Sequence, residues 1–269
     1  MARTLPLGSI IPEKWNALTL FLLLGIVCLA AVLRLHNIGS RTEFLGDQGR
    51  TGLVIYEWFS SGRIPLAGPT VLTGEHLGPF FYYLMAIPFT LFGFDPIVPA
   101  VFIALLGVAS VYLVIRISAR LFGIIPGLLV GAIWAVSPLL VRQDRILWEP
   151  NLIPFFALLY IFFLVLLWDR PRWSVWLGTG LVVGALVQLH YPNILFIPLT
   201  GLYWLMYPRF GRSGRLREFL VALLFLTSGF ILILLPFLFY ELSHGFADIG
   251  GVFMTLFGGQ GSLPRSVIV

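Results

Sequence analysis

Cysteine and charge are what this sequence has least of. Of its 269 residues only one, Cys28, is a cysteine, and it lies inside an apolar run. This excludes disulfides within the chain and metal sites built from several cysteines. Charged residues make up 11% of the chain, against roughly a quarter in a typical soluble domain. Together with 59% hydrophobic residues and a mean hydropathy of +0.97, this predicts a polytopic membrane protein.

The signatures of several soluble enzyme classes are also missing. The sequence holds no glycine-rich nucleotide-phosphate loop, no HExxH metal motif and no nucleophile elbow. Soluble nucleotide sugars and ATP are therefore not expected as direct substrates. The net charge of +5 comes from short basic clusters between apolar runs, which indicates membrane topology and not nucleic-acid binding. With no internal repeat and no separate soluble domain, residues 1–269 are predicted to form one transmembrane unit.

Apolar runs predict an all-α fold with about seven transmembrane helices. Each run is long enough, or nearly so, to cross a hydrocarbon core about 30 Å thick. The first run follows Lys14 as a secretory signal would, but it is about 20 residues long and no small-residue cleavage site precedes Arg34, which favours a retained anchor. The predicted spans are 16–35, 97–118, 124–141, 150–168, 173–190, 193–208 and 217–240.

An eighth apolar run, 80–92, is too short to span a bilayer. As a helix it would reach only about 20 Å, and it carries Pro88 in its middle. We therefore expect a juxtamembrane or re-entrant helix. It follows the long polar stretch 36–79, the predicted first extracytoplasmic loop. Within that loop, segment 51–60 mixes Trp and Tyr with aliphatic residues, which is typical of a short helix at the membrane interface.

Arginine clusters occur at every second predicted turn and orient the chain. The positive-inside rule places in the cytosol the turns that carry Arg116/Arg120, Arg170/Arg172 and Arg209–Arg217. The loop 36–79 and the turns 142–151, 188–193 and 240–246 then face outward from the inner (cytoplasmic) membrane. If 80–92 spanned instead, 12 of the 17 Lys and Arg would lie inside against 10 in the seven-span arrangement. Charge alone slightly favours this alternative, whereas loop length, Pro88 and the distribution of the acids favour seven spans.

The stretch "GDQGR", residues 46–50, carries the first candidate site residues. If a helix begins at Gln48, Asp47 is its cap, because a carboxylate accepts hydrogen bonds from the free amides of a first turn. Alternatively, Asp47 is a base or an orienting carboxylate at the membrane surface. Arg50 would then hold an anionic phosphate, for which its fork of donors is suited. The two hypotheses for Asp47 stay open at this point.

Two further stretches carry charged side chains beside predicted spans. Glu75 and His76 directly precede the short apolar run and are either an ordinary helix start or a polar contact near the site; one Glu-His pair is a weak metal signal. "VRQDRILWEPN" (141–151) crowds four charges at the mouth of two spans, where charge is costly unless it is paired or functional. An interfacial salt bridge anchored by Trp148 is the alternative for this stretch.

Two histidines near the predicted outer surface complete the candidates. His190 ends an apolar helix and is followed by Tyr191 and Asn193, so it is either a helix-end residue or a contact to a sugar or phosphate. Glu241 and His244 are spaced i, i+3 and share one helix face, but they lack a third partner for a metal ion.

Taken together, these motifs resemble the GT-C glycosyltransferases. Residues 46–93 are similar to the first outer loop of bacterial relatives of protein O-mannosyltransferases and of the lipid A aminoarabinose transferase (glycosyltransferase family 39-like). Asp47 matches the leading acid of an Asp-Glu pair, with Gln48 in place of the Glu. Glu75-His76 stands where Glu-Lys is usual, and "LGP" replaces a double proline. In the later segment "VSPLLVRQDRILWEPN", Glu149 is the best match to an acid that follows an Arg, and Asp144 is the second choice.

The resemblance implies a fold of seven helices with two juxtamembrane helices in the first outer loop. It also implies transfer of a sugar from a polyprenyl-phosphate carrier to a lipid, glycan or protein acceptor on the outer face of the cytoplasmic membrane. Family members usually continue beyond this module, so the chain ending at Val269 is expected to lack their C-terminal part.

The resemblance also implies roles for the candidate residues. Asp47 would be the base, and Arg50 and Arg145 would offset charge on the departing phosphate. Glu149 or Asp144 would orient the acceptor or a divalent metal ion, although no metal or other cofactor is assigned. The remaining substrate contacts expected are Glu75, His76, His190 and His244.

Two alternatives to an active transferase remain at the level of sequence. A transporter or flippase for lipid-linked sugars would need polar residues at mid-membrane, whereas here the acids gather near one face. An inactive, truncated paralogue that serves as an assembly partner is the other alternative. Membrane lipids are expected partners in every case, and nucleic acid is not.

Overall fold

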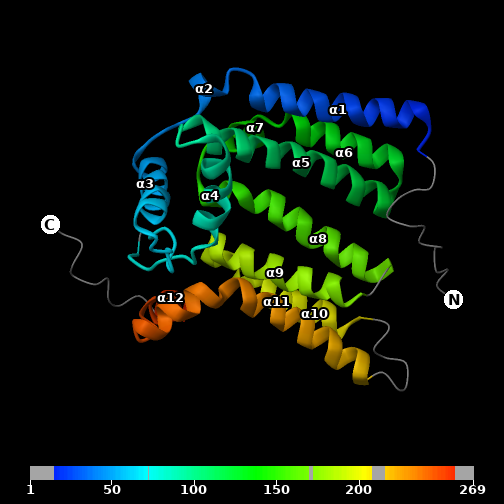
Figure 1. Cartoon of the computed structure of the whole chain (residues 1–269). Helices are drawn as coiled ribbons and strands as arrows, with labels where there is room; N and C mark the ends of the chain where they lie inside the picture. The colour runs from blue at the N-terminus through cyan, green and yellow to red at the C-terminus, as the bar shows by residue number, and fades with distance from the viewer. Residues whose placement is uncertain (1–14, 72, 170–171, 208–215, 258–269) are drawn as a thin grey trace.

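The computed structural model describes residues 15–71, 73–169, 172–207 and 216–257. Within these ranges the regular structure is helical apart from one isolated bridge between Thr70 and His76. The predicted all-α, polytopic fold is therefore confirmed (Figure 1). Several basic residues that bear on the topology, and the last residues of the chain, lie outside the described ranges: Arg3, Lys14, Arg170, Arg209, Arg212, Arg215 and the segment 258–269.

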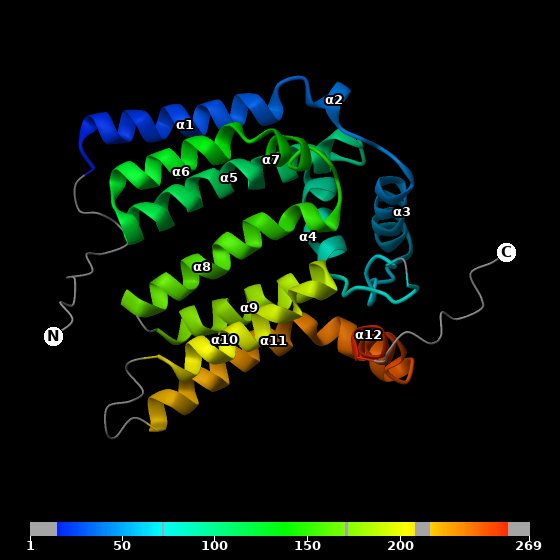
Figure 2. The ribbon, with the colours of Figure 1, turned by 180° about the vertical axis from the view of Figure 1, so that it is seen from behind.

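Long apolar helices run alongside one another and form the body of the molecule (Figures 1 and 2). In the described part of the chain, four segments are long and apolar enough to cross a membrane: Ala17–Leu35, Ile97–Phe122, Glu149–Trp168 and Leu216–Ser243. They correspond to four predicted spans. The helices that pack together in this body are α1 (Ala17–Leu35), α5 (Ile97–Phe122), α6 (Ile124–Val136), α8 (Ile153–Asp169), α9 (Trp173–Leu189), α10 (Phe196–Leu205) and α11 (Leu216–Ser243).

Two of the predicted spans are each divided into two helical segments. The run 124–141 forms α6 and the short α7 (Pro138–Gln143), with a break at Ser137 because Pro138 has no N–H with which to continue the helix. The run 193–208 forms a 3₁₀ turn, η2 (Tyr191–Leu195), and α10. With 10 residues, α10 is about 15 Å long, half of a hydrocarbon core.

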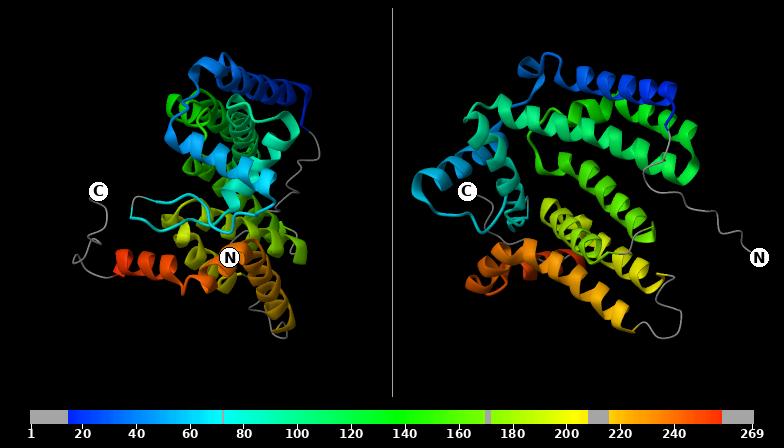
Figure 3. Two further views of the ribbon diagram at one scale, coloured as in Figure 1. Left: turned by 60° about the vertical axis from the view of Figure 1, so that its left-hand side comes forward. Right: turned by 45° about the vertical axis from the view of Figure 1, so that its right-hand side comes forward.

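Helices α3 (Gly46–Ser61) and α4 (Phe80–Phe92) lie across one end of this body instead of running along it (Figure 1). The bounds of α4 are those predicted, and its short length and orientation agree with a helix that does not span. Helix α3 is longer than the predicted interfacial segment 51–60. The short α2 (Ile38–Arg41) and α12 (Ala247–Phe257) lie at the same end, which Figure 3 (left) turns toward the viewer.

Close packing beneath α3 and α4 fixes them to the helix ends. Ile55 of α3, Phe81 and Met85 of α4, and Leu186 and Leu189 of α9 belong to one buried apolar cluster. Helices α9 and α11 approach more closely still, because glycines face each other's backbone. A Cβ at position 180 would lie 2.0 Å from the carbonyl oxygen of Leu226, which only glycine avoids. Residues of α3, α4, α9 and α12 are thereby held around one end of the bundle.

Candidate active site

A cavity of about 700 Å³ opens at the end where α3, α4 and α12 meet. Five of the predicted site residues lie in its wall: Asp47, Arg50, Glu75, Glu149 and His190. They come from segments far apart in the sequence. The rest of the wall is formed by Thr51, Pro69, Thr70, Val71, Thr73, Tyr82, Trp148, Pro150, Tyr191, Pro192 and Val252.

Asp47 reaches the cavity because another residue caps its helix. The N-cap of α3 is Leu45, and the Gln48 side chain accepts a hydrogen bond from the Leu45 N–H at 2.8 Å. The hypothesis that Asp47 is the cap is therefore wrong. Asp47 is the second residue of the helix and is exposed, in the first turn, where the helix dipole favours negative charge. Arg50 follows at i+3, on the same side of α3.

Gln48 also ties Asp47 to the segment that carries Glu149. Its amide nitrogen donates to the backbone oxygen of Leu147 at 2.8 Å, and the side chain is buried. Two residues later the chain enters η1 (Glu149–Leu152), where Asn151 donates to the backbone oxygen of Ile146 at 3.1 Å. Of the three carboxylates that line the cavity, Asp47 and Glu149 thus lie on segments that one buried amide joins.

Tyr82 is a buried residue of the cavity wall that the sequence analysis did not single out. Burial raises the pKa of its hydroxyl to about 12; Glu149 also raises this pKa, Arg50 lowers it and Asp47 raises it. All three charged groups therefore act on the same phenol, which stays neutral at ordinary pH. The tyrosine pair at the start of the short helix was the only signal in the sequence.

Glu75 and His190 form a second wall of the cavity. Glu75 follows a tight turn in which Gly74 has a φ of +101°, a conformation that favours glycine. Its Oε2 atom and the Nδ1 atom of His190 are buried, and no hydrogen-bond partner exists for either among the described residues. Burial also raises the pKa of the neighbouring Tyr191, as do Asp248, Glu75 and Glu241. This wall therefore offers polar atoms that a ligand or water can satisfy.

His76 and His244 lie outside the wall of the cavity. His76 Nδ1 is 3.1 Å from Asp248 Oδ2 of α12 and 3.3 Å from the hydroxyl of Tyr240. His244 is exposed and stacks on Tyr240 at 4.0 Å between ring centroids. Glu241 is fully buried and accepts from the Ile249 N–H at 3.2 Å, so it turns toward α12.

Asp144 and Arg145 are also absent from the wall. Asp144 is buried and pairs with Arg34, with 2.7 Å between Asp144 Oδ2 and Arg34 Nε. Arg145 donates to backbone oxygens at the end of α1. The local cause is the end of α7, which turns Asp144 toward α5, where Gly107 leaves room for its carboxylate. Of the two acids proposed to follow an Arg, the cavity therefore contains only Glu149.

A metal ion has no ready-made site in the described part of the chain. No group of three or more His, Cys, Asp or Glu side chains there is arranged to hold one. Asp47, Glu75, Glu149 and His190 all line the cavity, but no three of them are grouped as the ligands of one metal ion. The divalent metal ion considered above stays a prediction, and no chemistry is derived through it.

Comparison with known families identifies the class of this protein. The family model described as dolichyl-phosphate-mannose-protein mannosyltransferase matches residues 76–240, which is more than half of the chain and runs from the start of α4 into α11. No curated protein matches the chain. Asp47, Arg50 and Glu75 precede the matched region, so the comparison does not reach them. Membership of this family explains the helical fold and the resemblance of the loops: the chain belongs to the dolichyl-phosphate-mannose-protein mannosyltransferase family and is a multi-pass membrane glycosyltransferase of the GT-C type.

Proposed function

We propose that this protein transfers a sugar from a polyprenyl-phosphate carrier to a hydroxyl group of a lipid, glycan or protein acceptor at the outer face of the cytoplasmic membrane. The observation that carries the proposal is the cavity itself. It brings Asp47, Arg50 and Glu149 together at the end of a bundle of apolar helices. A lipid-linked donor presents its phosphate at that depth of the membrane.

Asp47 is the general base in this proposal. It takes the proton from the acceptor hydroxyl as the oxygen attacks the anomeric carbon of the sugar. The bond between that carbon and the phosphate oxygen breaks, the electron pair leaves with the phosphate, and the configuration at the anomeric carbon inverts. A positioned base contributes roughly 10²–10⁴-fold in rate.

Arg50 offsets the charge that develops on the departing phosphate. It follows Asp47 by one helical turn, so a substrate that contacts the carboxylate lies within reach of the guanidinium. Tyr82 is neutral, and its hydroxyl donates a hydrogen bond to an oxygen of the bound substrate. Glu149 orients the acceptor hydroxyl toward Asp47.

The second wall, with Glu75 and His190, binds the sugar through its hydroxyl groups. Glu75 Oε2 and His190 Nδ1 are buried polar atoms without a partner in the described structure, and such atoms are rare unless a ligand or water satisfies them. Two such atoms in the wall of one cavity favour a polyhydroxylated ligand.

Arginines at the far end of the bundle support the outward orientation. Arg116 and Arg120 lie in the last two turns of α5, Arg172 precedes α9, and Arg217 lies in the first turn of α11. These helix ends are opposite to α3 and α4 (Figure 2). Under the positive-inside rule that end is cytosolic, so the cavity faces outward.

The test is a transfer assay on the purified chain in lipid nanodiscs. Short-chain polyprenyl-phosphate mannose serves as the donor, and a serine- and threonine-containing peptide as the acceptor. Asp47→Asn is expected to lower kcat by about 100-fold or more. Glu57→Gln, which changes an exposed carboxylate on the same helix but outside the cavity, is the matched control and should keep wild-type activity.

Full activity of folded Asp47→Asn would contradict the assignment of the base. Wild-type protein that moves the donor across vesicle membranes without transferring mannose would instead favour a flippase.

A further inference from the structure

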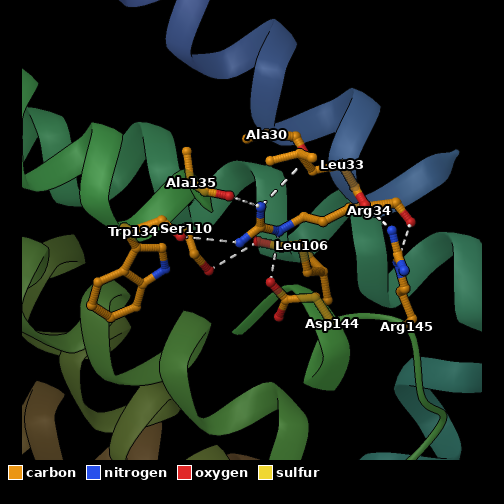
Figure 4. Close-up of polar contacts among 9 residues, drawn as sticks. All are labelled: Ala30, Leu33, Arg34, Leu106, Ser110, Trp134, Ala135, Asp144 and Arg145. Carbon is orange, nitrogen blue, oxygen red and sulfur yellow. Dashed lines mark hydrogen bonds and ion pairs between the residues drawn. The ribbon is translucent and has the colours of Figure 1, made fainter. Parts of the chain in front are cut away.

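Arg34 is a fully buried cation at the end of the first transmembrane helix. It lies in the last turn of α1, and none of its surface is exposed. Its guanidinium donates to the backbone oxygens of Ala135 at 2.9 Å and Trp134 at 3.5 Å (Figure 4). These oxygens belong to the last turn of α6, where Pro138 supplies no N–H to Trp134. Arg34 of α1 therefore caps the C-terminus of α6.

Arg145 makes the reciprocal contact to α1. Its Nε donates to the backbone oxygen of Arg34 at 3.1 Å, and its guanidinium also bonds to the oxygen of Leu33. Both oxygens lie in the last turn of α1, which ends at Leu35. Positive charge is favourable at the C-terminus of a helix. Two arginines thus cap two neighbouring helices at the same end of the bundle.

Asp144 connects the two caps. Its Oδ2 lies 2.7 Å from Arg34 Nε, and it is adjacent in sequence to Arg145. The carboxylate sits against Gly107 of α5, where an added Cβ would lie 2.3 Å from Oδ2. Glycine at 107 therefore provides the space in which the buried ion pair forms.

The segment between this ion pair and the cavity is held at three successive residues. The backbone oxygens of Arg145, Ile146 and Leu147 accept hydrogen bonds from Thr42 at 2.7 Å, Asn151 at 3.1 Å and Gln48 at 2.8 Å, respectively. The next residues, Trp148 and Glu149, line the cavity. The chain therefore has little freedom from Asp144 to Glu149.

We infer that Arg34, Asp144 and Arg145 form a clamp that positions segment 144–149 and so sets the place of Glu149 in the cavity. The clamp residues are positioning residues, because none of them lines the cavity. The catalytic consequence rests on the proposed function, whereas the positioning of the segment does not.

Thiol labelling tests the clamp without any need for activity. In a Cys28→Ser background, Leu147→Cys places a thiol at a site that is 3% exposed within the clamped segment. A charged maleimide should modify this thiol slowly. The double variant Arg34→Gln/Asp144→Asn removes both charges together, since removal of one would leave the other buried and unpaired. We expect the labelling rate at position 147 to rise about tenfold or more, because the segment opens locally.

Two controls make the labelling result specific. The exposed pair Arg142–Glu43, at 3.0 Å, is the matched pair, and Arg142→Gln/Glu43→Gln should leave labelling at position 147 unchanged. Leu77→Cys, fully buried and outside the clamped segment, should label equally slowly with and without the clamp. A rise at position 77 as large as that at 147 would show general unfolding and would contradict a local clamp.

Gly107→Ala provides a second way to release the clamp. It keeps both charges but forces the Asp144 carboxylate to move, so it should raise labelling at position 147 in the same direction. This variant decides the question if Arg34→Gln/Asp144→Asn does not fold. Unchanged labelling at 147 in a folded clamp variant would overturn the inference.

Steady-state kinetics with polyprenyl-phosphate mannose and the peptide acceptor then test whether the clamp affects catalysis. The clamp variants should lower kcat about tenfold and leave the donor KM within about twofold, because Arg50 stays on α3. If the wild type shows no transfer, the proposed function fails while the labelling result still decides the clamp. Wild-type kcat in a variant with raised labelling would contradict a positioning role.

Discussion

The two walls of the cavity differ in how their polar groups are satisfied. On one wall, Asp47 and Arg50 lie one turn apart on α3, and Gln48 joins that helix to the segment that carries Glu149. On the other, Glu75 Oε2 and His190 Nδ1 are buried without partners in the described structure. A wall with a carboxylate that can accept a proton and a cation that can offset negative charge suits bond breaking. A wall of buried polar atoms without partners suits binding. In the proposed function, the chemistry therefore belongs to the first wall and sugar recognition to the second.

Arg50→Gln should have the largest effect among the variants that compare the two walls. Loss of the guanidinium removes the charge that offsets the departing phosphate, so we expect kcat to fall about 100-fold with a smaller rise in the donor KM. Arg50→Lys should recover part of this loss, because it keeps the charge but not the fork of donors. The measurement is steady-state transfer with polyprenyl-phosphate mannose; equal activity of Gln and Arg at position 50 would remove Arg50 from the chemistry.

Glu75→Gln should weaken donor binding more than it slows the chemical step, and this would distinguish the second wall from the first. We expect the donor KM to rise about tenfold while kcat changes less than about threefold, since the lost interaction is made equally in the ground and transition states. Glu57→Gln, exposed on α3 and outside the cavity, is again the control. A fall in kcat at unchanged KM would place Glu75 with the catalytic wall instead.

Tyr82→Phe should have the smallest effect and should not depend on pH. Burial raises the pKa of Tyr82 from its ordinary value of 10.0 to about 12, so the phenol keeps its proton throughout the range pH 6–9. Loss of one neutral hydrogen-bond donor should lower kcat/KM about fivefold, and this factor should be the same at every pH in that range. A ratio of wild-type to variant activity that falls between pH 8 and 9 would mean that Tyr82 ionises in the working enzyme.

The organisation of the helices follows from local properties of the sequence. Four predicted spans correspond to helices long and apolar enough to cross a membrane, because a bilayer selects apolar runs of sufficient length whatever their neighbours are. The bounds of α4 were predictable because the run between Gly78 and Gly93 is short and contains Pro88. The break before Pro138 was missed because hydropathy does not register a missing N–H.

The side-chain partners were less predictable, because they are contacts between distant segments. Gln48, and not Asp47, accepts the hydrogen bond from the N-cap residue Leu45, and the Gln48 amide is held by the backbone of Leu147, 99 residues away in the chain. The spacing of Asp144 and Glu149 from Arg145 could not separate an ion-paired acid from one that faces the cavity. Asp144 is the ion-paired acid because Gly107 leaves space for its carboxylate and Arg34 supplies the opposite charge. Both of these residues are distant from Asp144 in the sequence.

The sequence by itself determined that this protein is a helical membrane protein and that the run of α4 is short, and four of its seven predicted spans are helices long and apolar enough to cross a membrane. Hydropathy and proline act locally, so a single chain suffices to read them. Only the tertiary structure decided which charged residues face a common cavity and which lie buried in pairs. That choice depends on the space and the hydrogen-bond partners that other helices supply, because a charge near the membrane is stable only where a partner meets it.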